Sequence, residues 1–245
     1  MSTIVLYDIA NDAPFGSISP NVAKIRYVPA HRPDAERGVS FQTVGVDLSE
    51  LPELYKKLGV KPASDGGGVQ YTLPMIHDQK TGAAAANSLD IALYLDATYP
   101  ATPRLIPAGT GALHAVLTAM WSAKVGGPIS AFTYPASFPL FKPATRKFFE
   151  DTGRSPAGMV FSEEAKRAKW AEVKAGLDAM DAFIGAGNAY FTGDSLSYAD
   201  LVLAGSLRWA KVALSKEQWA EIAGWNAGRW GKLMAEMEKY DGLNA

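Results

Sequence analysis

Cysteine is absent from the 245 residues of the chain. This excludes thiol nucleophiles, CxxC redox chemistry, disulfides and thiolate-bound zinc or iron–sulfur centres. Histidine is nearly as scarce, because only His31, His77 and His114 are present, far apart and outside any HxxxH or HExxH motif. We therefore expect no metal site, and without a GxSxG motif we expect no serine–histidine–aspartate triad.

The sequence also lacks an excess of charge and any long apolar run. Its net charge is −1, which gives no electrostatic reason to expect a nucleic acid or an anionic membrane as the main partner. No apolar run reaches the ~18 residues that span a bilayer. The N-terminus "MSTIVLYDIAND" has neither a basic segment nor the apolar core of a signal peptide, so we expect a soluble, cytoplasmic protein.

The first hundred residues alternate between strand and helix patterns. The β-branched and apolar runs at 3–9, 39–48 and 71–78 predict strands, and "QKTGAAAA" carries a turn and a short last strand. Apolar spacing after Pro20, at 51–60 and at 87–100 predicts three helices. This order predicts an α/β unit with a mixed four-stranded sheet.

Strand patterns nearly vanish after residue 100. The stretch "PATPRLIPAGTG" is rich in proline, glycine and threonine, as linkers are. Beyond it, four long amphipathic patterns predict helices. We therefore expect an α/β domain over 1–100, a linker over 101–110 and an all-α domain over 111–245.

Pro74 interrupts the predicted strand "YTLPMIHD". Proline has no backbone N–H to donate to a neighbouring strand. Its presence here therefore indicates an edge strand with a trans peptide bond, a β-bulge, or a turn with a cis peptide bond. In the cis case, Leu73 would offer its backbone N–H and C=O to an extended, peptide-like ligand.

Two helix starts follow. In "NSLDI", Asn87 or Ser88 can cap the helix, Asp90 can complete a capping box with Asn87, and a helix N-terminus also attracts carboxylates. In "SYAD", Ser197 and Asp200 form a capping box before an apolar helix, which predicts a structural role.

In their order and spacing, these features resemble a cytosolic glutathione transferase over essentially the whole chain. The resemblance implies a thioredoxin-like N-terminal domain, glutathione as cosubstrate and a homodimer. It also implies that Leu73, before a cis Pro74, pairs with the glutathione backbone, and that Asn87 and Ser88 bind the γ-glutamyl carboxylate. Asn87 departs from the usual acidic residue, so its contact with the γ-glutamyl amine would lack a formal charge. Lys57 lies where relatives bind the glycyl carboxylate, although a solvated helix lysine is the simpler interpretation.

The stretch "FGSISPNVAKIR" raises the question of which hydroxyl meets the glutathione sulfur. Ser19 before Pro20 is first of all a common helix start. It also falls where omega-like transferases carry Cys-Pro, and the segment resembles that of lignin β-etherases and fungal FuA-type transferases. A serine hydroxyl there can donate to the thiolate, aided by the helix N-terminus. Ser19 is our first candidate, with Ser17 and Tyr7 as alternatives.

An aromatic, proline-rich segment over 120–141 follows the linker. Its Pro and Gly residues predict little regular helix, and such a segment fits one wall of an apolar cleft, or else an ordinary core. The candidate acceptor-pocket residues are Trp121, Phe132, Tyr134, Phe138 and Phe141.

The resemblance implies a transferase acting on aromatic electrophiles, most specifically by cleaving β-aryl (β-O-4) ethers with release of a phenolate. The alternative is a non-catalytic carrier of phenolic or hydrophobic compounds. Residues 29–38, "PAHRPDAERG", replace the segment that usually follows the first helix, and their effect on glutathione binding stays open.

Overall fold

The structure is a computed structural model that describes residues 2–13, 16–28, 39–62 and 70–238. The interpretation of residues 29–38 lies outside the described residues. The N-terminal region holds the elements β1 (Ser2–Ile9), α1 (Pro20–Arg26), β2 (Val39–Val46), η2 (Leu48–Glu50), α3 (Leu51–Leu58), β3 (Met75–Asp78), β4 (Ala84–Ala86) and α4 (Ser88–Thr98). The helical region holds α5 (Gly111–Trp121), η3 (Ser122–Gly126), α6 (Gly127–Ser137), η4 (Phe138–Leu140), α7 (Pro143–Asp151), η5 (Pro156–Gly158), α8 (Glu163–Ile184), α9 (Tyr198–Ala213) and α10 (Lys216–Glu238).

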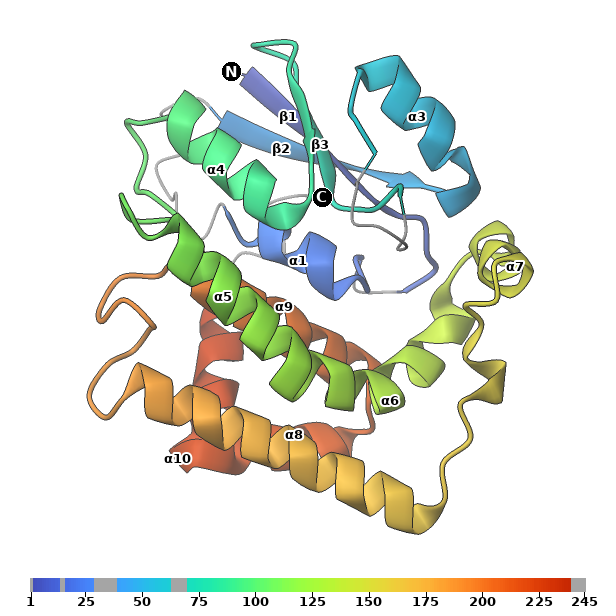
Figure 1. The fold of residues 1–245 in the computed structure, drawn as a ribbon, viewed down its shortest axis with the longest axis vertical. Coiled ribbons are helices and arrows are strands. Elements are labelled where there is room, and N and C mark those ends of the chain that lie inside the picture. The colour runs from blue at the N-terminus through green and yellow to red at the C-terminus, as the bar shows by residue number, and fades with distance from the viewer. Residues whose placement is uncertain (1, 14–15, 29–38, 63–69, 239–245) are drawn as a thin grey trace.

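The four strands form one mixed sheet in the order β2-β1-β3-β4. β1 pairs in parallel with β2 and antiparallel with β3, and Tyr7 of β1 lies opposite Met75. Helices α1 and α4 lie between this sheet and the helical region (Figure 1). The predicted α/β region with a mixed four-stranded sheet, followed by helices, is confirmed.

The third strand is shorter than predicted. It begins at Met75 rather than at residue 71, directly after the cis Leu73–Pro74 peptide bond. The cis interpretation of Pro74 is thereby confirmed.

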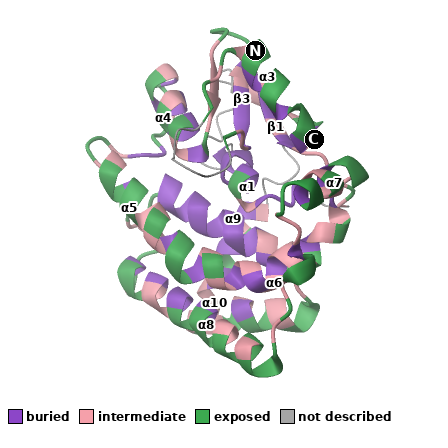
Figure 2. Cartoon of the chain, turned by 45° about the vertical axis from the view of Figure 1, so that its right-hand side comes forward, coloured by how far each residue is buried: buried purple, intermediate pink, exposed green. Residues whose placement is uncertain are grey.

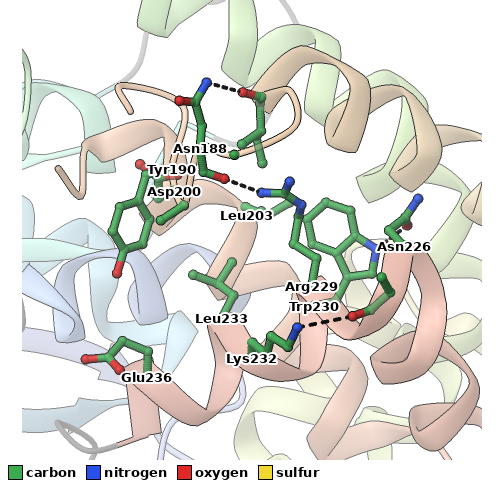
Figure 3. A pocket seen from close by; sticks show the side chains of 14 residues that line it. Asn188, Tyr190, Asp200, Leu203, Asn226, Arg229, Trp230, Lys232, Leu233 and Glu236 are labelled. Carbon is green, nitrogen blue, oxygen red and sulfur yellow. Dashed lines mark hydrogen bonds between the residues drawn. The ribbon is translucent and has the colours of Figure 1, made fainter. Parts of the chain in front are cut away.

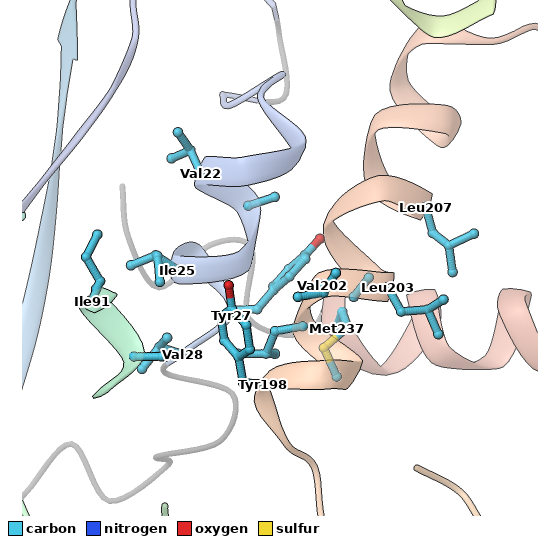
Figure 4. Close-up of a cluster of buried hydrophobic side chains, with 14 of the residues drawn as sticks. Val22, Ile25, Tyr27, Val28, Ile91, Tyr198, Val202, Leu203, Leu207 and Met237 are labelled. Carbon is cyan, nitrogen blue, oxygen red and sulfur yellow. The ribbon is translucent and has the colours of Figure 1, made fainter. Parts of the chain in front are cut away.

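Helix α1 begins as its sequence predicts. Ser19 is the N-cap, and its Oγ accepts a hydrogen bond from the Val22 N–H at 3.3 Å. Pro20 occupies the first helical position, where its missing N–H costs nothing. α1 packs against α9, and the apolar side chains between the two helices are drawn in Figure 4.

Helix α9 forms the centre of the helical region, and most of its side chains are buried (Figure 2). The predicted capping box is present at its start. The Ser197 N–H and hydroxyl both donate to Asp200 Oδ2, at 2.8 and 2.7 Å, and the Phe191 N–H donates to Oδ1 at 3.0 Å. The box therefore fixes where α9 begins and, with it, the position of Tyr198.

The connection from α4 to α5 is hydrogen-bonded both to α4 of the sheet region and to α9 of the helical region. The Asp96 carboxylate accepts hydrogen bonds from the N–H groups of Leu105 and Ile106, at 2.9 and 2.8 Å. The Leu105 carbonyl in turn accepts from the Tyr198 N–H at 2.7 Å. α9 is thus tied to the end of the sheet region.

The prediction of little regular helix over 120–141 is wrong. The chain continues from α5 through the π-helical turn η3 into α6. Pro128 lies in the first turn of α6, directly after the π-helical turn, and Pro135 lies inside the helix. Within the described residues, no helix is long and apolar enough to cross a membrane.

Candidate active site

A cavity of about 810 Å3 opens between α1, the start of β3, the start of α4 and the helices α5 and α9. Four of the predicted site residues, Leu73, Pro74, Asn87 and Ser88, line it together. The sequence had separated these pairs by thirteen residues, and the fold brings them to one wall. Other lining residues include Asn21, Lys24, Lys61, Thr118, Asp90 and Tyr198.

The segment before β3 presents backbone groups to this cavity. The Leu73 N–H and C=O have no hydrogen-bond partner in the described part of the chain. The segment is held by Tyr55, whose hydroxyl donates to the Thr72 carbonyl at 2.7 Å and accepts from the Thr72 N–H at 3.1 Å. Leu73 therefore offers one donor and one acceptor at a fixed position.

The start of α4 forms the adjoining wall. Asn87 has a positive φ of 75°, unusual for a residue other than glycine, and its side chain caps the helix by accepting from the Leu89 N–H at 3.1 Å. The Asn87 N–H donates to the Pro74 carbonyl at 3.2 Å, so the expected capping box with Asp90 does not form. Ser88 is buried, and its Oγ lies 2.8 Å from the Tyr198 hydroxyl.

Lys24 of α1 is a cationic group in this cavity that the sequence analysis did not single out. It is only 8% exposed, and its Nζ donates to Asn21 Oδ1 at 2.8 Å. No carboxylate of the described residues pairs with it. Burial lowers the pKa of Lys24 to about 8, because a charged amine loses hydration there.

Replacing Lys24 by methionine is expected to raise the free energy of unfolding at neutral pH. Below pH 8, Lys24 is protonated in both folded and unfolded chains, and the full cost of burying its charge is present. Between about 8 and its ordinary value of 10.5, the folded protein releases the proton first, so stability rises with pH. Lys24→Met removes this rise. Urea unfolding of the wild type and of Lys24→Met, at neutral pH and at about pH 9, measures the free energy of unfolding and its change with pH. A Lys24→Met protein that is less stable than the wild type at neutral pH would contradict the expectation.

The three candidate hydroxyls occupy different environments. Ser19 is largely buried at the N-cap of α1, two residues before Asn21 of the cavity wall. Its Oγ accepts from the Val22 N–H, and no acceptor among the described residues takes its own hydrogen, so that hydrogen can be donated. Tyr7 is half-buried, and burial raises the pKa of its phenol.

Ser17 belongs to a buried polar group beside β1. Its hydroxyl lies near the Asp8 carboxylate, although no atom of the described residues meets full hydrogen-bond geometry with its Oγ. Burial raises the pKa of Asp8 to about 6, opposed by Ser17, the Ile9 N–H and the guanidinium groups of Arg26 and Arg208. Since Asp8 faces α1, the alternation of side chains along a strand directs its neighbour Tyr7 to the opposite face of the sheet.

Like the three candidate hydroxyls, the remaining predicted residues do not line the cavity. Lys57 is exposed on α3, whereas Lys61, four residues later, lines the wall. Trp121 is buried and donates to Ser206 Oγ at 2.8 Å, and Phe132 packs edge-on against Trp170 at 5.2 Å.

The other three aromatic residues form a cluster with Phe149 of α7. The ring centroids of Tyr134, Phe138 and Phe141 lie 6.0, 6.1 and 5.4 Å from that of Phe149. This cluster adjoins the segment that follows β1, because the Asp12 N–H donates to the Leu140 carbonyl at 2.8 Å.

A second cavity, of about 480 Å3, lies wholly among helical-region residues (Figure 3). Its polar side chains pair with the protein: Arg229 donates to Asp181 Oδ1 at 2.5 Å and to the Asn188 carbonyl at 2.8 Å. None of the predicted site residues lines it.

Sequence reasoning missed Lys24, Asn21, Lys61 and Tyr198 as cavity residues. The signal for Lys24 was Gly205, which sits in an apolar helix and lets α1 approach so closely that the lysine stem is covered. Nothing in the sequence pattern around Tyr198 indicates that its hydroxyl reaches Ser88.

Comparison with known proteins identifies the family to which this chain belongs. A family model described as "Glutathione S-transferase, C-terminal domain" matches residues 112–240. The glutathione S-transferase-like protein ustS of Aspergillus flavus is 27% identical over 253 residues, which cover 95% of this chain and 88% of that protein.

Two crystal structures agree closely. The glutathione S-transferase CsGST63524 of Ceriporiopsis subvermispora, solved in complex with glutathione, is 32% identical with a TM-score of 0.85 over 97% of both chains. Glutathione transferase GSTFuA3 of Phanerochaete chrysosporium is 30% identical with a TM-score of 0.85 over 99% of both chains. The chain is therefore a member of the cytosolic glutathione transferase superfamily, with its thioredoxin-like sheet region and its helical domain.

Proposed function

We propose that the cavity binds glutathione and that the Ser19 hydroxyl donates a hydrogen bond to its thiolate. The observation that carries the proposal is the Ser19 hydroxyl hydrogen, for which the described residues hold no acceptor. It lies at the N-terminus of α1, whose residues Asn21 and Lys24 line the cavity with Leu73 and Ser88. A donor and a positive helix end both favour the thiolate over the thiol. Ser17 is second, since its hydroxyl is buried beside the Asp8 carboxylate on β1. Tyr7 is third, since it points to the other face of the sheet.

Glutathione is held by backbone and charge. Its cysteinyl backbone pairs with the free N–H and C=O of Leu73, and its γ-glutamyl carboxylate meets Ser88 and the N-terminus of α4 at Asn87. Lys24 offers a positive charge to a carboxylate of the same molecule. Lys61, rather than Lys57, takes the glycyl carboxylate because it lines the wall.

The substrate that we propose is a β-aryl ether with a neighbouring ketone. The thiolate sulfur forms a bond to the carbon that carries the aryloxy group, the carbon–oxygen bond breaks, and its electron pair leaves with the phenolate. A phenol has a pKa near 10, so the departing oxygen needs no strong acid from the protein. The cluster of Tyr134, Phe138 and Phe141, beside the segment after β1, provides the aromatic side of the acceptor site.

In the proposed arrangement, residues 1–100 form the domain that binds glutathione and residues 101–110 form the linker. Residues 111–245 form the helical domain that lines the binding site of the acceptor substrate.

We also propose a homodimer. Leu93 on α4 is 43% exposed, and Leu113 and Val116 on α5 are 68% and 65% exposed. Large exposed apolar side chains mark a protein interface where they form one patch, and sedimentation of the purified chain measures the assembly directly.

Incubation with glutathione and a β-O-4 model ketone is expected to release the phenol and to yield a glutathione thioether. Product analysis by chromatography and mass spectrometry measures both products.

The alternative function, a carrier of phenolic compounds, is favoured by the same aromatic cluster. It predicts that the wild type binds the ether and the phenol but never releases one from the other, over a panel of aryl ethers and other electrophiles.

A further inference from the structure

The hydroxyl of Ser88 is joined to a residue of the other domain. Its Oγ lies 2.8 Å from the Tyr198 hydroxyl, across 110 residues of sequence. Ser88 is 6% exposed and Tyr198 is 1% exposed. Both residues line the glutathione cavity, so the contact lies directly behind the proposed carboxylate subsite.

Tyr198 is held rigidly from several sides. Its N–H donates to the Leu105 carbonyl, and the capping box of Ser197 and Asp200 fixes the helix end that carries it. Its ring meets His114 of α5 edge-on at 6.2 Å. Figure 4 shows it among the apolar side chains between α1 and α9.

The direction of the hydrogen bond follows from the chemistry of the two hydroxyls. A phenol is a stronger donor than an aliphatic alcohol, and burial raises the pKa of Tyr198 to about 12, so it keeps its proton. If Tyr198 donates, Ser88 accepts with its oxygen, and its own hydrogen stays available for the cavity. Hydrogen bonds in such a chain strengthen one another.

We propose that Tyr198 is a positioning residue for glutathione: by donating to Ser88 Oγ, it directs the Ser88 hydrogen at the γ-glutamyl carboxylate. This inference rests on the proposed function, because it takes Ser88 as the carboxylate partner. It assigns part of glutathione affinity to the helical domain, through a residue that touches Ser88 rather than the reacting sulfur.

A double-mutant cycle on glutathione binding tests the inference. Tyr198→Phe keeps the ring and removes only the hydroxyl. It is expected to weaken glutathione binding about fivefold, the effect of losing one neutral hydrogen bond, and to raise KM for glutathione with kcat unchanged at saturation. Ser88→Ala is expected to weaken binding about tenfold, because its partner is charged. In the Ser88→Ala background, Tyr198→Phe should have no further effect.

The matched control is Tyr94→Phe. It makes the same chemical change on α4, where the Tyr94 hydroxyl donates to Asp78 Oδ2 at 2.7 Å and does not line the cavity. It should leave glutathione affinity at the wild-type value, and thermal unfolding shows that all variants are folded.

The outcomes distinguish a failure of the Tyr198 positioning role from a failure of the proposed carboxylate subsite at Ser88. Equal losses from Tyr198→Phe in the wild-type and Ser88→Ala backgrounds would overturn the positioning role, as would no loss in either. If Ser88→Ala itself leaves glutathione binding unchanged, the carboxylate subsite in the proposed function is wrong as well. Because binding is measured by calorimetry with glutathione alone, the result does not depend on which acceptor the enzyme uses.

Discussion

Removal of the Ser19 hydroxyl is expected to lower kcat/KM by about tenfold to a hundredfold at neutral pH, because the glutathione thiolate loses a charge-assisted hydrogen bond. Alanine is a poor probe, since it also removes the N-cap of α1 at a cost of about 0.5–2 kcal/mol. Glycine caps a helix almost as well as serine, to within a few tenths of a kcal/mol. Ser19→Gly should therefore retain wild-type stability and lose activity.

The matched control for Ser19→Gly is Ser19→Thr, which keeps both a hydroxyl and a cap and should retain much of the activity. Steady-state kinetics with one electrophile compares these variants with Ser17→Ala and Tyr7→Phe, for which we expect smaller losses. A Tyr7→Phe protein that loses more activity than Ser19→Gly would transfer the role to the tyrosine.

Gly205→Ala is expected to destabilise the protein and to impair the active site together. A Cβ at Gly205 would overlap the Pro20 carbonyl oxygen and lie 3.2 Å from the Lys24 Cγ. Because the overlapped oxygen belongs to the backbone of α1, the steric overlap can be removed only if α1 moves away from α9. Overpacking of this kind costs about 1–3 kcal/mol.

The activity loss in Gly205→Ala follows from the same shift. Displacement of α1 moves Ser19, and a displacement of about 1 Å costs about a hundredfold in rate. Gly224→Ala is the matched control, because a Cβ at this exposed position of α10 meets nothing within 4 Å. Urea unfolding and turnover measure both effects. A Gly205→Ala protein with wild-type stability would show that α1 and α9 are not packed as described.

Local rules predicted much of this fold from sequence. Ser19 and Pro20 start α1, Ser197 and Asp200 start α9, and alternating apolar runs mark the strands. Each of these signals acts within a few residues of its own position, where backbone hydrogen bonding and side-chain periodicity decide the outcome. The pairing of Leu73 with Asn87 and Ser88 was inferred from family resemblance, and the cavity brings them together.

The rest depends on packing between distant segments. Residues 120–141 were predicted to hold little regular helix because of their prolines, yet α6 includes both Pro128 and Pro135. Lys24 was not singled out by the sequence pattern, and the close approach of α9 at Gly205 covers its stem. The bond between Ser88 and Tyr198 joins two domains, and no local pattern encodes it.

Titration of the enzyme-bound glutathione thiol tests the role of Ser19 most directly. The ultraviolet absorbance of the thiolate, followed against pH in the binary complex, gives its pKa in the wild type and in Ser19→Gly. We predict a pKa below the ordinary value of about 8.5 in the wild type and a return toward that value in Ser19→Gly. The same pKa in both proteins would contradict thiolate stabilisation by Ser19.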